Sequence, residues 1–290
     1  MSGEFLHFEY RAPNTVEEAC SLLSRYKGKA RVIAGGTDLL ISMKAKQIIP
    51  QEIINLKAIP NLDYIHYTDE EGLRIGALAT MHDIENSPII QERFPMLASA
   101  ARQMGSPGIR NIATIAGNIC RAAPSADTAT PLLALKAKLK IVSDAGARIV
   151  SLEEFFVGPG ETVLRSDEIL TEIQIPNPTP ITLSAYVRSS ARAAVAIAQV
   201  VVSVVVTLEK TSIVDARIFL GAVAPTPVRA TQAEEILKGK AIDDSLIEKA
   251  AQAALAAAKP ISDIRCSALY RNEMIKVLVY RALRQVTISI

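Results

Sequence analysis

The sequence predicts an α+β protein of two domains, the second smaller than the first. The chain of 290 residues is long for a single hydrophobic core and sufficient for two. Short helical and extended segments alternate up to residue 175, and a strand-rich, β-branched stretch followed by helices comes after. Pro176–Pro180 (PNPTP) is the best linker candidate between these two patterns. We therefore expect a domain boundary near residue 177, with domains at 1–177 and 178–290.

The first domain is expected to contain short helices and strands. Residues 14–26 have helical spacing, with Thr15 as the candidate N-cap. Residues 89–104 predict one continuous helix that ends at a Gly-Ser-Pro-Gly breaker. Residues 109–128 are poor in charge and rich in small side chains, so we predict an ordered loop there. The remaining expected elements are an extended run at 29–33, strands at 51–56 and 168–175, hairpins at 62–77 and 138–151, and a helix at 82–86.

The second domain is expected to combine an antiparallel sheet with helices. Residues 198–210 are β-branched and strand-like, and 213–222 would pair with them as an antiparallel neighbour. Helical spacing with many alanines is found at 231–237, 244–258 and 268–283.

Charge and hydropathy argue against a nucleic-acid partner and against membrane insertion. The 32 basic residues nearly balance the 30 acidic ones, and no basic stripe is present. The longest apolar stretch, around Val195–Leu208, is broken by Gln199 and Ser203 and is too short to span a bilayer. Because Met1–Tyr10 lacks the basic start and apolar core of a signal peptide, a cytoplasmic location is expected.

The reactive side chains are few and scattered. Cys20, Cys120 and Cys266 lie far apart and form no CxxC, so the sequence offers neither a zinc site nor an iron–sulfur site. Reduced, mostly buried thiols are expected instead. With only three histidines, the usual general bases are scarce, which indicates that a bound cofactor supplies the chemistry.

The segment AGGTDLL at 34–40 is the first of two candidate ligand loops. A strand runs into Gly35 and Gly36, and a helix is expected to follow. Glycine lets the backbone approach a ligand closely, and successive free N–H groups at a helix N-terminus attract an anion such as a pyrophosphate. The same residues also fit a plain tight turn in which Thr37 or Asp38 caps the helix.

The second candidate loop is IRNIATIAGNICRAAPSAD at 109–127. Its small side chains would admit a flat ligand, with Thr114, Asn118 and Asp127 as hydrogen-bonding groups. An Asp after such a loop suits ribose hydroxyls, as in other dinucleotide sites. The alternative is a small-residue loop packed against the core. Neither loop matches GxGxxG or GxxxxGK[ST], so a Rossmann or P-loop site is not indicated.

These two motifs resemble the FAD-binding loops of the medium subunits of molybdenum hydroxylases. That family includes carbon monoxide dehydrogenase, xanthine dehydrogenase and nicotinate or quinoline oxidoreductases. Segments at 155–176, 219–230 and 262–283 are similar to further family landmarks, so the resemblance covers nearly the whole chain. It implies an α+β fold: a two-part FAD-binding domain of the vanillyl-alcohol oxidase/CO dehydrogenase flavoprotein type, with subdomains of about 1–57 and 58–177, followed by a smaller α+β C-terminal domain with an antiparallel sheet and helices.

The resemblance also implies which residues bind FAD, and it implies no catalytic or metal-binding residue in this chain. The backbone of residues 34–38 would hold the pyrophosphate, Asp127 would bind ribose, and Ile169 and Leu170 would pack near the adenine. Tyr186 and Arg188 would lie near the flavin ring, where a cation stabilises reduced, anionic flavin. The full predicted set is Ile33, Ala34, Gly35, Gly36, Thr37, Asp38, Leu39, Thr114, Gly117, Asn118, Ala123, Asp127, Ile169, Leu170, Tyr186 and Arg188.

Two departures from the family pattern concern the flavin end of this site. Arg188 replaces the lysine more often found there, which keeps the charge and changes the geometry. Ala196 stands where the family usually has an Asp, so flavin reactivity is expected to differ. Without the resemblance, Tyr186 and Arg188 would be interpreted as a half-exposed pair on a strand. The chain also lacks the four cysteines that hold an additional [4Fe–4S] cluster in some relatives.

The implied function is that of an electron-relaying oxidoreductase subunit. Substrate would be hydroxylated at a molybdenum–pterin centre in a large partner, and electrons would pass through [2Fe–2S] clusters of a small partner to the FAD of this chain and then to an external acceptor. A dimer of heterotrimers is expected. Two alternatives are a self-contained flavin oxidoreductase of the same fold, disfavoured by the scarcity of histidines, and a scaffold subunit without flavin, disfavoured by the intact glycines and Asp127.

Overall fold

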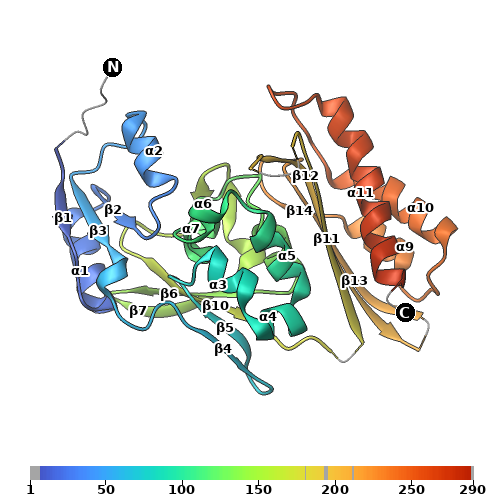
Figure 1. Ribbon diagram of the computed structural model, residues 1–290, viewed down its shortest axis with the longest axis horizontal. Helices are drawn as coiled ribbons and strands as arrows, with labels where there is room; N and C mark the ends of the chain where they lie inside the picture. The colour runs from blue at the N-terminus through green and yellow to red at the C-terminus, as the bar shows by residue number, and fades with distance from the viewer. Residues whose placement is uncertain (1–6, 180, 193–194, 211, 289–290) are drawn as a thin grey trace.

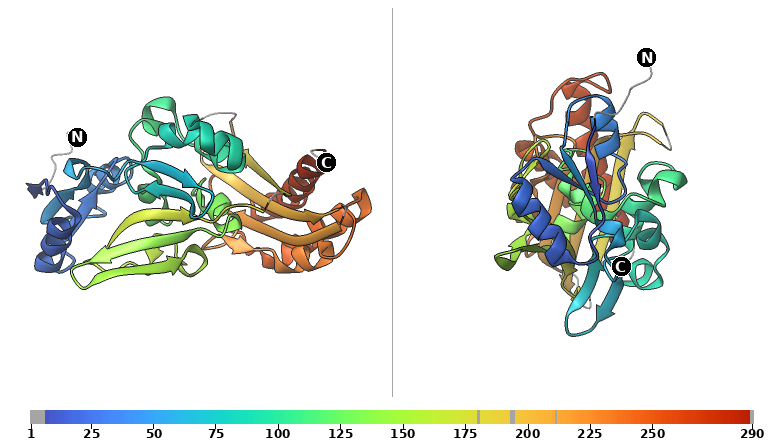
Figure 2. Two further views of the ribbon diagram at one scale, coloured as in Figure 1. Left: turned by 90° about the horizontal axis from the view of Figure 1, so that it is seen from below. Right: turned by 90° about the vertical axis from the view of Figure 1, so that its left-hand side faces the viewer.

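Three main β-sheets follow one another along the long axis of the computed structural model, which describes residues 7–179, 181–192, 195–210 and 212–288. Figure 1 shows them from the N-terminal subdomain in blue to the C-terminal domain in orange and red, and Figure 2 shows the same succession from below. The first sheet is parallel and the other two are antiparallel. Helices pack on all three, which confirms the α+β class.

The extended run and the strand predicted between residues 29 and 56 belong to the first sheet, and the helix predicted at 14–26 packs on it. The helix begins as predicted, because the Thr15 hydroxyl accepts a hydrogen bond from the main-chain N–H of Glu18 at 3.1 Å. The strand that enters the glycine turn lies at one edge of the sheet. The elements are β1 (Glu9–Arg11), α1 (Val16–Tyr26), β2 (Ala30–Ile33), α2 (Leu39–Lys44), β3 (Glu52–Asn55) and η1 (Leu56–Ala58), with the strands in the order β1-β3-β2.

The second sheet confirms both predicted hairpins and the strand at 168–175. That late strand, β10, inserts between the two hairpins, so residues a hundred positions apart in the chain become neighbours. Its strands are β4 (Ile65–Thr68), β5 (Gly72–Gly76), β10 (Ile169–Ile175), β6 (Lys138–Ser143) and β7 (Gly146–Ser151), in that spatial order. A small pair, β8 (Phe156–Gly158) and β9 (Glu161–Thr162), and the 3-10 turn η2 (Leu152–Glu154) precede β10.

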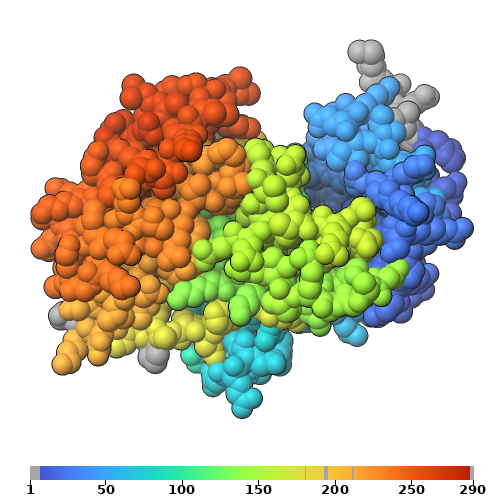
Figure 3. Space-filling model, turned by 180° about the vertical axis from the view of Figure 1, so that it is seen from behind, coloured from blue at the N-terminus to red at the C-terminus, as the bar shows by residue number. Residues whose placement is uncertain are grey.

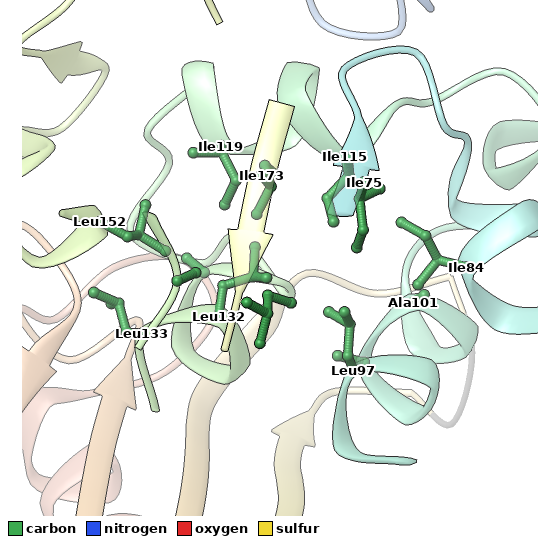
Figure 4. Packing of buried hydrophobic residues seen from close by; sticks show 14 of the residues in the cluster. Ile75, Ile84, Leu97, Ala101, Ile115, Ile119, Leu132, Leu133, Leu152 and Ile173 are labelled. Carbon is green, nitrogen blue, oxygen red and sulfur yellow. The ribbon is translucent and has the colours of Figure 1, made fainter. Parts of the chain in front are cut away.

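Short helices cover one face of this second sheet. Figure 4 shows Ile173 of β10 and Ile75 of β5 packed among apolar side chains from several helices, including Ile115, Leu97 and Leu132. Burial of these side chains on one side of the strands fixes the register, because a one-residue shift would turn them to the other face. The helices are α3 (Met81–Asn86), α4 (Pro88–Arg93), α5 (Pro95–Gln103), α6 (Pro107–Arg110), α7 (Ile115–Cys120) and α8 (Ala129–Ala134).

Two of the helical predictions need correction. The continuous helix predicted at 89–104 is divided into α4 and α5 at Phe94, whose ψ of 49° is not helical. Pro95 is the cause, since the residue before a proline is disfavoured in the helical region. The loop predicted at 109–128 contains α7, which begins where the Thr114 hydroxyl accepts a hydrogen bond from the main-chain N–H of Gly117 at 3.1 Å. The predicted loop therefore contains a short helix with a threonine N-cap.

The C-terminal domain has the predicted antiparallel pair and helices, with some differences in length. A further strand, β11, contains Tyr186 and Arg188 and pairs with β12. The helix predicted at 244–258 ends earlier and continues as a 3-10 turn, and the last helix is longer than predicted. The elements are β11 (Thr182–Ser190), β12 (Ala198–Glu209), β13 (Ser212–Gly221), β14 (Val228–Arg229), α9 (Thr231–Leu237), α10 (Asp244–Ala253), η3 (Ala254–Ala257) and α11 (Ala268–Ile288).

The central strand β12 is buried on both faces. Val201 and Val205 pack into the core of the first domain, whereas Val202 and Val204 pack into a second core with α9, α10 and α11. Successive side chains of a strand point to opposite faces, so a run of valines serves two cores at once. The C-terminal sheet therefore packs with one face against the core of each domain.

Candidate cofactor site

One large cavity, of about 1310 Å³, lies where the N-terminal subdomain, the rest of the first domain and the C-terminal domain meet. Both glycine-rich segments predicted from the sequence line it. Residues 195–198, 222–225 and part of 259–271 close it from the C-terminal domain. From behind, Figure 3 shows the surface hollowed between the blue N-terminal subdomain and the yellow-green segments beside it.

Gly35 is the point at which the two loops touch. A Cβ atom built at this position would lie 2.0 Å from the carbonyl oxygen of Ile112, which is a severe overlap with main chain. Gly36 has a φ of 73°, in the left-handed region that glycine adopts without strain. Both glycines are therefore required by the path of the chain, one for close approach and one for its backbone angle.

Main-chain donors are available at this turn. Within the described part of the chain, the N–H groups of Gly35, Gly36, Thr37 and Asp38 donate no hydrogen bond to another protein atom. All four residues line the cavity. Asp38 is the N-cap residue of α2, as the alternative of a capped turn predicted, but its side chain makes no capping hydrogen bond. Free amides facing a cavity suit an anion.

The second loop presents a helix N-terminus and an oriented amide. The hydroxyl of Thr128, a fully buried residue, donates to Oδ1 of Asn118 at 2.6 Å. At the other end of the same amide, Nδ2 of Asn118 donates to the sulfur of Met104 at 3.8 Å. A Cβ on Gly117 would lie 2.9 Å from the Thr114 hydroxyl that caps α7. The segment also packs against the core, as the alternative predicted, through Ala113, Ile115, Ala116, Ile119 and Ala126, while Thr114, Gly117 and Asn118 line the cavity.

Asp127 carries the buried carboxylate of the site. Its Oδ1 accepts hydrogen bonds from the Tyr186 hydroxyl and from Nη1 of Arg188, each at 2.8 Å. Burial raises the pKa of this carboxyl, while the charge of Arg188 and the bond from Tyr186 oppose the rise. The same burial raises the pKa of the Tyr186 hydroxyl well above its usual value, so it stays a donor.

All of the predicted site residues line the cavity except Tyr186 and Arg188. These two lie behind Asp127 and contact it from the C-terminal domain. Their side chains are not half-exposed, since Tyr186 is 5% exposed and the Arg188 side chain 7%. Ala196, the position where an Asp was expected, does line the cavity.

Sequence reasoning missed part of the contribution of the C-terminal domain. Lys259, Asp263, Arg265 and Arg271 also line the cavity. Asp263 accepts hydrogen bonds from the main-chain N–H groups of Arg265 and Cys266 and from the Arg271 guanidinium, which hold the pKa of its carboxyl low, at about 2. The segment 262–283 was noticed only as a family landmark, and nothing in its local pattern indicates that it reaches the first domain.

The donor set fits a dinucleotide and not a metal. Mostly apolar side chains, free amides and a few charged groups surround a space large enough for a flavin dinucleotide. Arg121 lies 3.5 Å from the Asp38 carboxylate, so it offsets a negative charge close to the free amides. In the described ranges no cluster of three or more His, Cys, Asp or Glu side chains could hold a metal ion. Cys120 lines the cavity as a neutral thiol, because burial raises its pKa to about 12.

Comparison with known proteins agrees with this interpretation. Residues 6–178 match the family model described as the FAD binding domain in molybdopterin dehydrogenase, and residues 185–286 match the CO dehydrogenase flavoprotein C-terminal domain. The chain belongs to the FAD-binding subunits of the molybdenum hydroxylases. The resemblance stated from the sequence and the fold it implied are both confirmed.

Named members of this flavoprotein family are similar over nearly their full length. The carbon monoxide dehydrogenase medium chain of Hydrogenophaga pseudoflava is 35% identical over 95% of this chain and 96% of its own. The nicotinate dehydrogenase FAD-subunit of Eubacterium barkeri is 33% identical over 93% of this chain and 92% of its own. Each is a subunit of an oxidoreductase, and so is this chain.

Solved flavoprotein subunits of the same family superpose closely. Carbon monoxide dehydrogenase from Hydrogenophaga pseudoflava matches with a TM-score of 0.94 at 34% identity, covering 98% of each chain. Quinoline 2-oxidoreductase from Pseudomonas putida 86 matches with a TM-score of 0.93 at 28% identity, covering 99% of each chain. In the part of the chain that the structure describes, no helix is long and apolar enough to cross a membrane.

Proposed function

We propose that this subunit holds FAD in the cavity and passes electrons from [2Fe–2S] clusters of a small partner subunit to an external acceptor. A large molybdopterin-binding subunit would carry out the hydroxylation, and two heterotrimers would form a dimer. The relatives named as medium chains and FAD-subunits support this assignment. The observation that carries it is the contact of two glycine-containing loops that line one cavity, of which the first has free amides at residues 35–38.

The chain's residues would bind the cofactor from three sides. The amides of Gly35, Gly36, Thr37 and Asp38 would donate to the diphosphate, with α2 adding its N-terminal dipole. Arg121 would offset the repulsion between the diphosphate and the Asp38 carboxylate. We assign the same cofactor to the other predicted residues that line the cavity: Ile33, Ala34, Leu39, Thr114, Gly117, Asn118, Ala123, Asp127, Ile169 and Leu170.

These contacts set the direction in which the cofactor lies. Ile169 and Leu170 on β10 would pack on the adenine, and Asp127 would accept a hydrogen bond from a ribose hydroxyl. The isoalloxazine would then lie toward residues 195–198 and 222–225 of the C-terminal domain. When bound, FAD supplies two-electron and one-electron redox chemistry, and the residues of this chain would hold and orient it.

Purification of the subunit together with its partners tests the proposal. We expect one FAD per chain, released by acid, and bleaching of the flavin absorbance when the hydroxylation substrate is added to the intact complex. A folded preparation that binds no added FAD would contradict the cofactor assignment. Bleaching of the isolated subunit by a small organic donor would instead favour a self-contained flavin oxidoreductase.

A further inference from the structure

We propose that Arg188 is a positioning residue for the cofactor, which acts by holding Asp127 and does not act as a cation on the flavin. This inference rests on the proposed FAD site. It changes the role expected from the sequence, in which the Arg188 charge stabilised reduced flavin directly. The contacts of the guanidinium, the free oxygen of Asp127 and the division of these residues between two domains carry it.

The guanidinium of Arg188 is committed to protein oxygens. Nη1 donates to Oδ1 of Asp127 and to the carbonyl oxygen of Gln103, both at 2.8 Å, and Nη2 donates to the carbonyl oxygen of Ala196. The side chain does not line the cavity. One planar fork thus joins the loop before α8, the end of α5 and the loop after β11, which a lysine ammonium cannot bridge with the same geometry.

The positive charge of Arg188 is balanced where it lies. At 2.8 Å from Asp127, with both side chains buried, the two charges form a close pair whose field falls off faster than that of a lone cation. A bound flavin would therefore experience the weak field of a neutral ion pair and not the field of a lone cation. The backbone carbonyl of Ala196, whose residue lines the cavity, is held by the same fork, so Arg188 also shapes the wall beside the ring.

The two carboxylate oxygens of Asp127 have different surroundings, the protein at Oδ1 and the cavity at Oδ2. Oδ1 accepts both bonds from Tyr186 and Arg188, and among the described residues no donor reaches Oδ2. Because Oδ2 is not a buried unpaired atom and the residue lines the cavity, this oxygen is left for a ligand hydroxyl. Orientation of the carboxylate therefore comes from the C-terminal domain, although Asp127 belongs to the first domain.

Removal of Arg188 should also change the protonation of Asp127. Burial already raises the pKa of this carboxyl, and Arg188 is the strongest influence that opposes the rise. In Arg188→Gln the carboxyl would hold its proton to higher pH and would lose its capacity as an anionic acceptor. FAD affinity of this variant should then increase as pH rises and the carboxyl ionises, over a range in which the wild type is unaffected.

A double-mutant cycle on the full-length subunit tests the proposal. FAD dissociation constants would be measured by flavin fluorescence for the wild type, Arg188→Gln, Asp127→Asn and the double variant between about pH 6 and pH 9. We expect each single change to weaken binding by about 10-fold or more, and the double variant to be within about 3-fold of Asp127→Asn. Only Arg188→Gln should show binding that strengthens with pH.

Further variants separate the proposed role of Arg188 from a general loss of folding and from a direct effect of its charge on the flavin. Tyr186→Phe removes one bond to Oδ1 with little change in volume and should weaken FAD binding less than Arg188→Gln does. Arg102→Gln removes an exposed charge beside Gln103 and should leave the dissociation constant unchanged. The midpoint potential of the bound flavin should be the same in the wild type and in the double variant, because the ion pair and the two amides that replace it are both neutral.

Two results would overturn the inference. Multiplicative losses in the cycle, together with a lower flavin potential in the double variant than in the wild type, would mean that Arg188 acts on the flavin itself. Unchanged FAD affinity at every pH in Arg188→Gln and Tyr186→Phe would mean that the cluster is only structural. If the wild type binds no FAD, the proposed function fails instead, so the two failures are distinguishable.

Discussion

Gly35 shows what one missing side chain does for the site. The Cα of Gly35 packs so closely against the carbonyl of Ile112 that a methyl group there would overlap main-chain atoms at 2.0 Å. Main chain cannot move aside as the end of a side chain can. We therefore predict that Gly35→Ala separates the two loops, destabilises the fold by about 1–3 kcal/mol and lowers FAD content.

Gly108→Ala is the matched control for this change. Gly108 lies in α6, on the same segment as the second loop, and the nearest atom to an added Cβ is 4.0 Å away. Alanine favours a helix over glycine by up to about 1 kcal/mol, so this variant should be neutral or slightly more stable. Urea unfolding and flavin absorbance would compare the two. Equal behaviour of both variants would refute the steric argument.

At the scale of elements, strand β13 holds the two domains together through one buried arginine. Arg217 donates to the carbonyl oxygens of Leu133 at 2.9 Å and Ala134 at 3.1 Å, at the end of α8, and also pairs with Glu153. Helix C-terminal carbonyls lack partners within the helix, and a cation there also interacts favourably with the dipole. Its side chain is 7% exposed.

We predict that Arg217→Ala lowers the free energy of unfolding by about 2 kcal/mol, because it leaves the carbonyl oxygen of Ala134 without its donor and takes from the carbonyl of Leu133 one of its donors. Asp215→Ala on the same strand is the control. Asp215 also pairs across the domains, with Lys136 at 3.2 Å, but both side chains are about half exposed. That change should cost less than about 1 kcal/mol. Chemical denaturation measures both, and a similar loss in each would contradict the distinction.

The same scale shows what the sequence could and could not predict. Strands such as β10 and β12 and helices such as α1 were predictable, because their residues alternate or repeat in a local pattern. The short helix α7 was missed, since a helix of six residues gives little periodicity and the decisive signal is the Thr114 cap.

For the site, the two glycine loops were predictable because each carries its own motif. The contact between Gly35 and Ile112, which joins them, depends on folding of residues 77 positions apart, and no local pattern encodes it. The same holds for Arg188: its charge was visible in the sequence, but its partner Asp127 was not. The resemblance to a family gave positions for these residues and could not give their contacts.

At the scale of the whole molecule, the C-terminal sheet belongs to two cores. Val201 and Val205 of β12, with Phe219 of β13, are part of the core of the first domain, and the opposite face of the sheet packs on α9, α10 and α11. Separating the domains would expose a large apolar face. Such exposure is unfavourable by about 25 cal/mol for each Å² of apolar surface, so neither part is expected to be stable alone.

We therefore predict that the full chain unfolds in a single cooperative transition, with calorimetric and van't Hoff enthalpies that agree. Val201→Ala and Val204→Ala, on opposite faces of β12, should each lower stability by about 2 kcal/mol and shift the one midpoint. Val214→Ala, at a position that is 39% exposed, should shift it much less. A fragment beginning at residue 181 should aggregate, because it lacks the partner for its valine face. Two resolved transitions, or a soluble and folded fragment, would show that the C-terminal sheet does not couple the unfolding of the two domains.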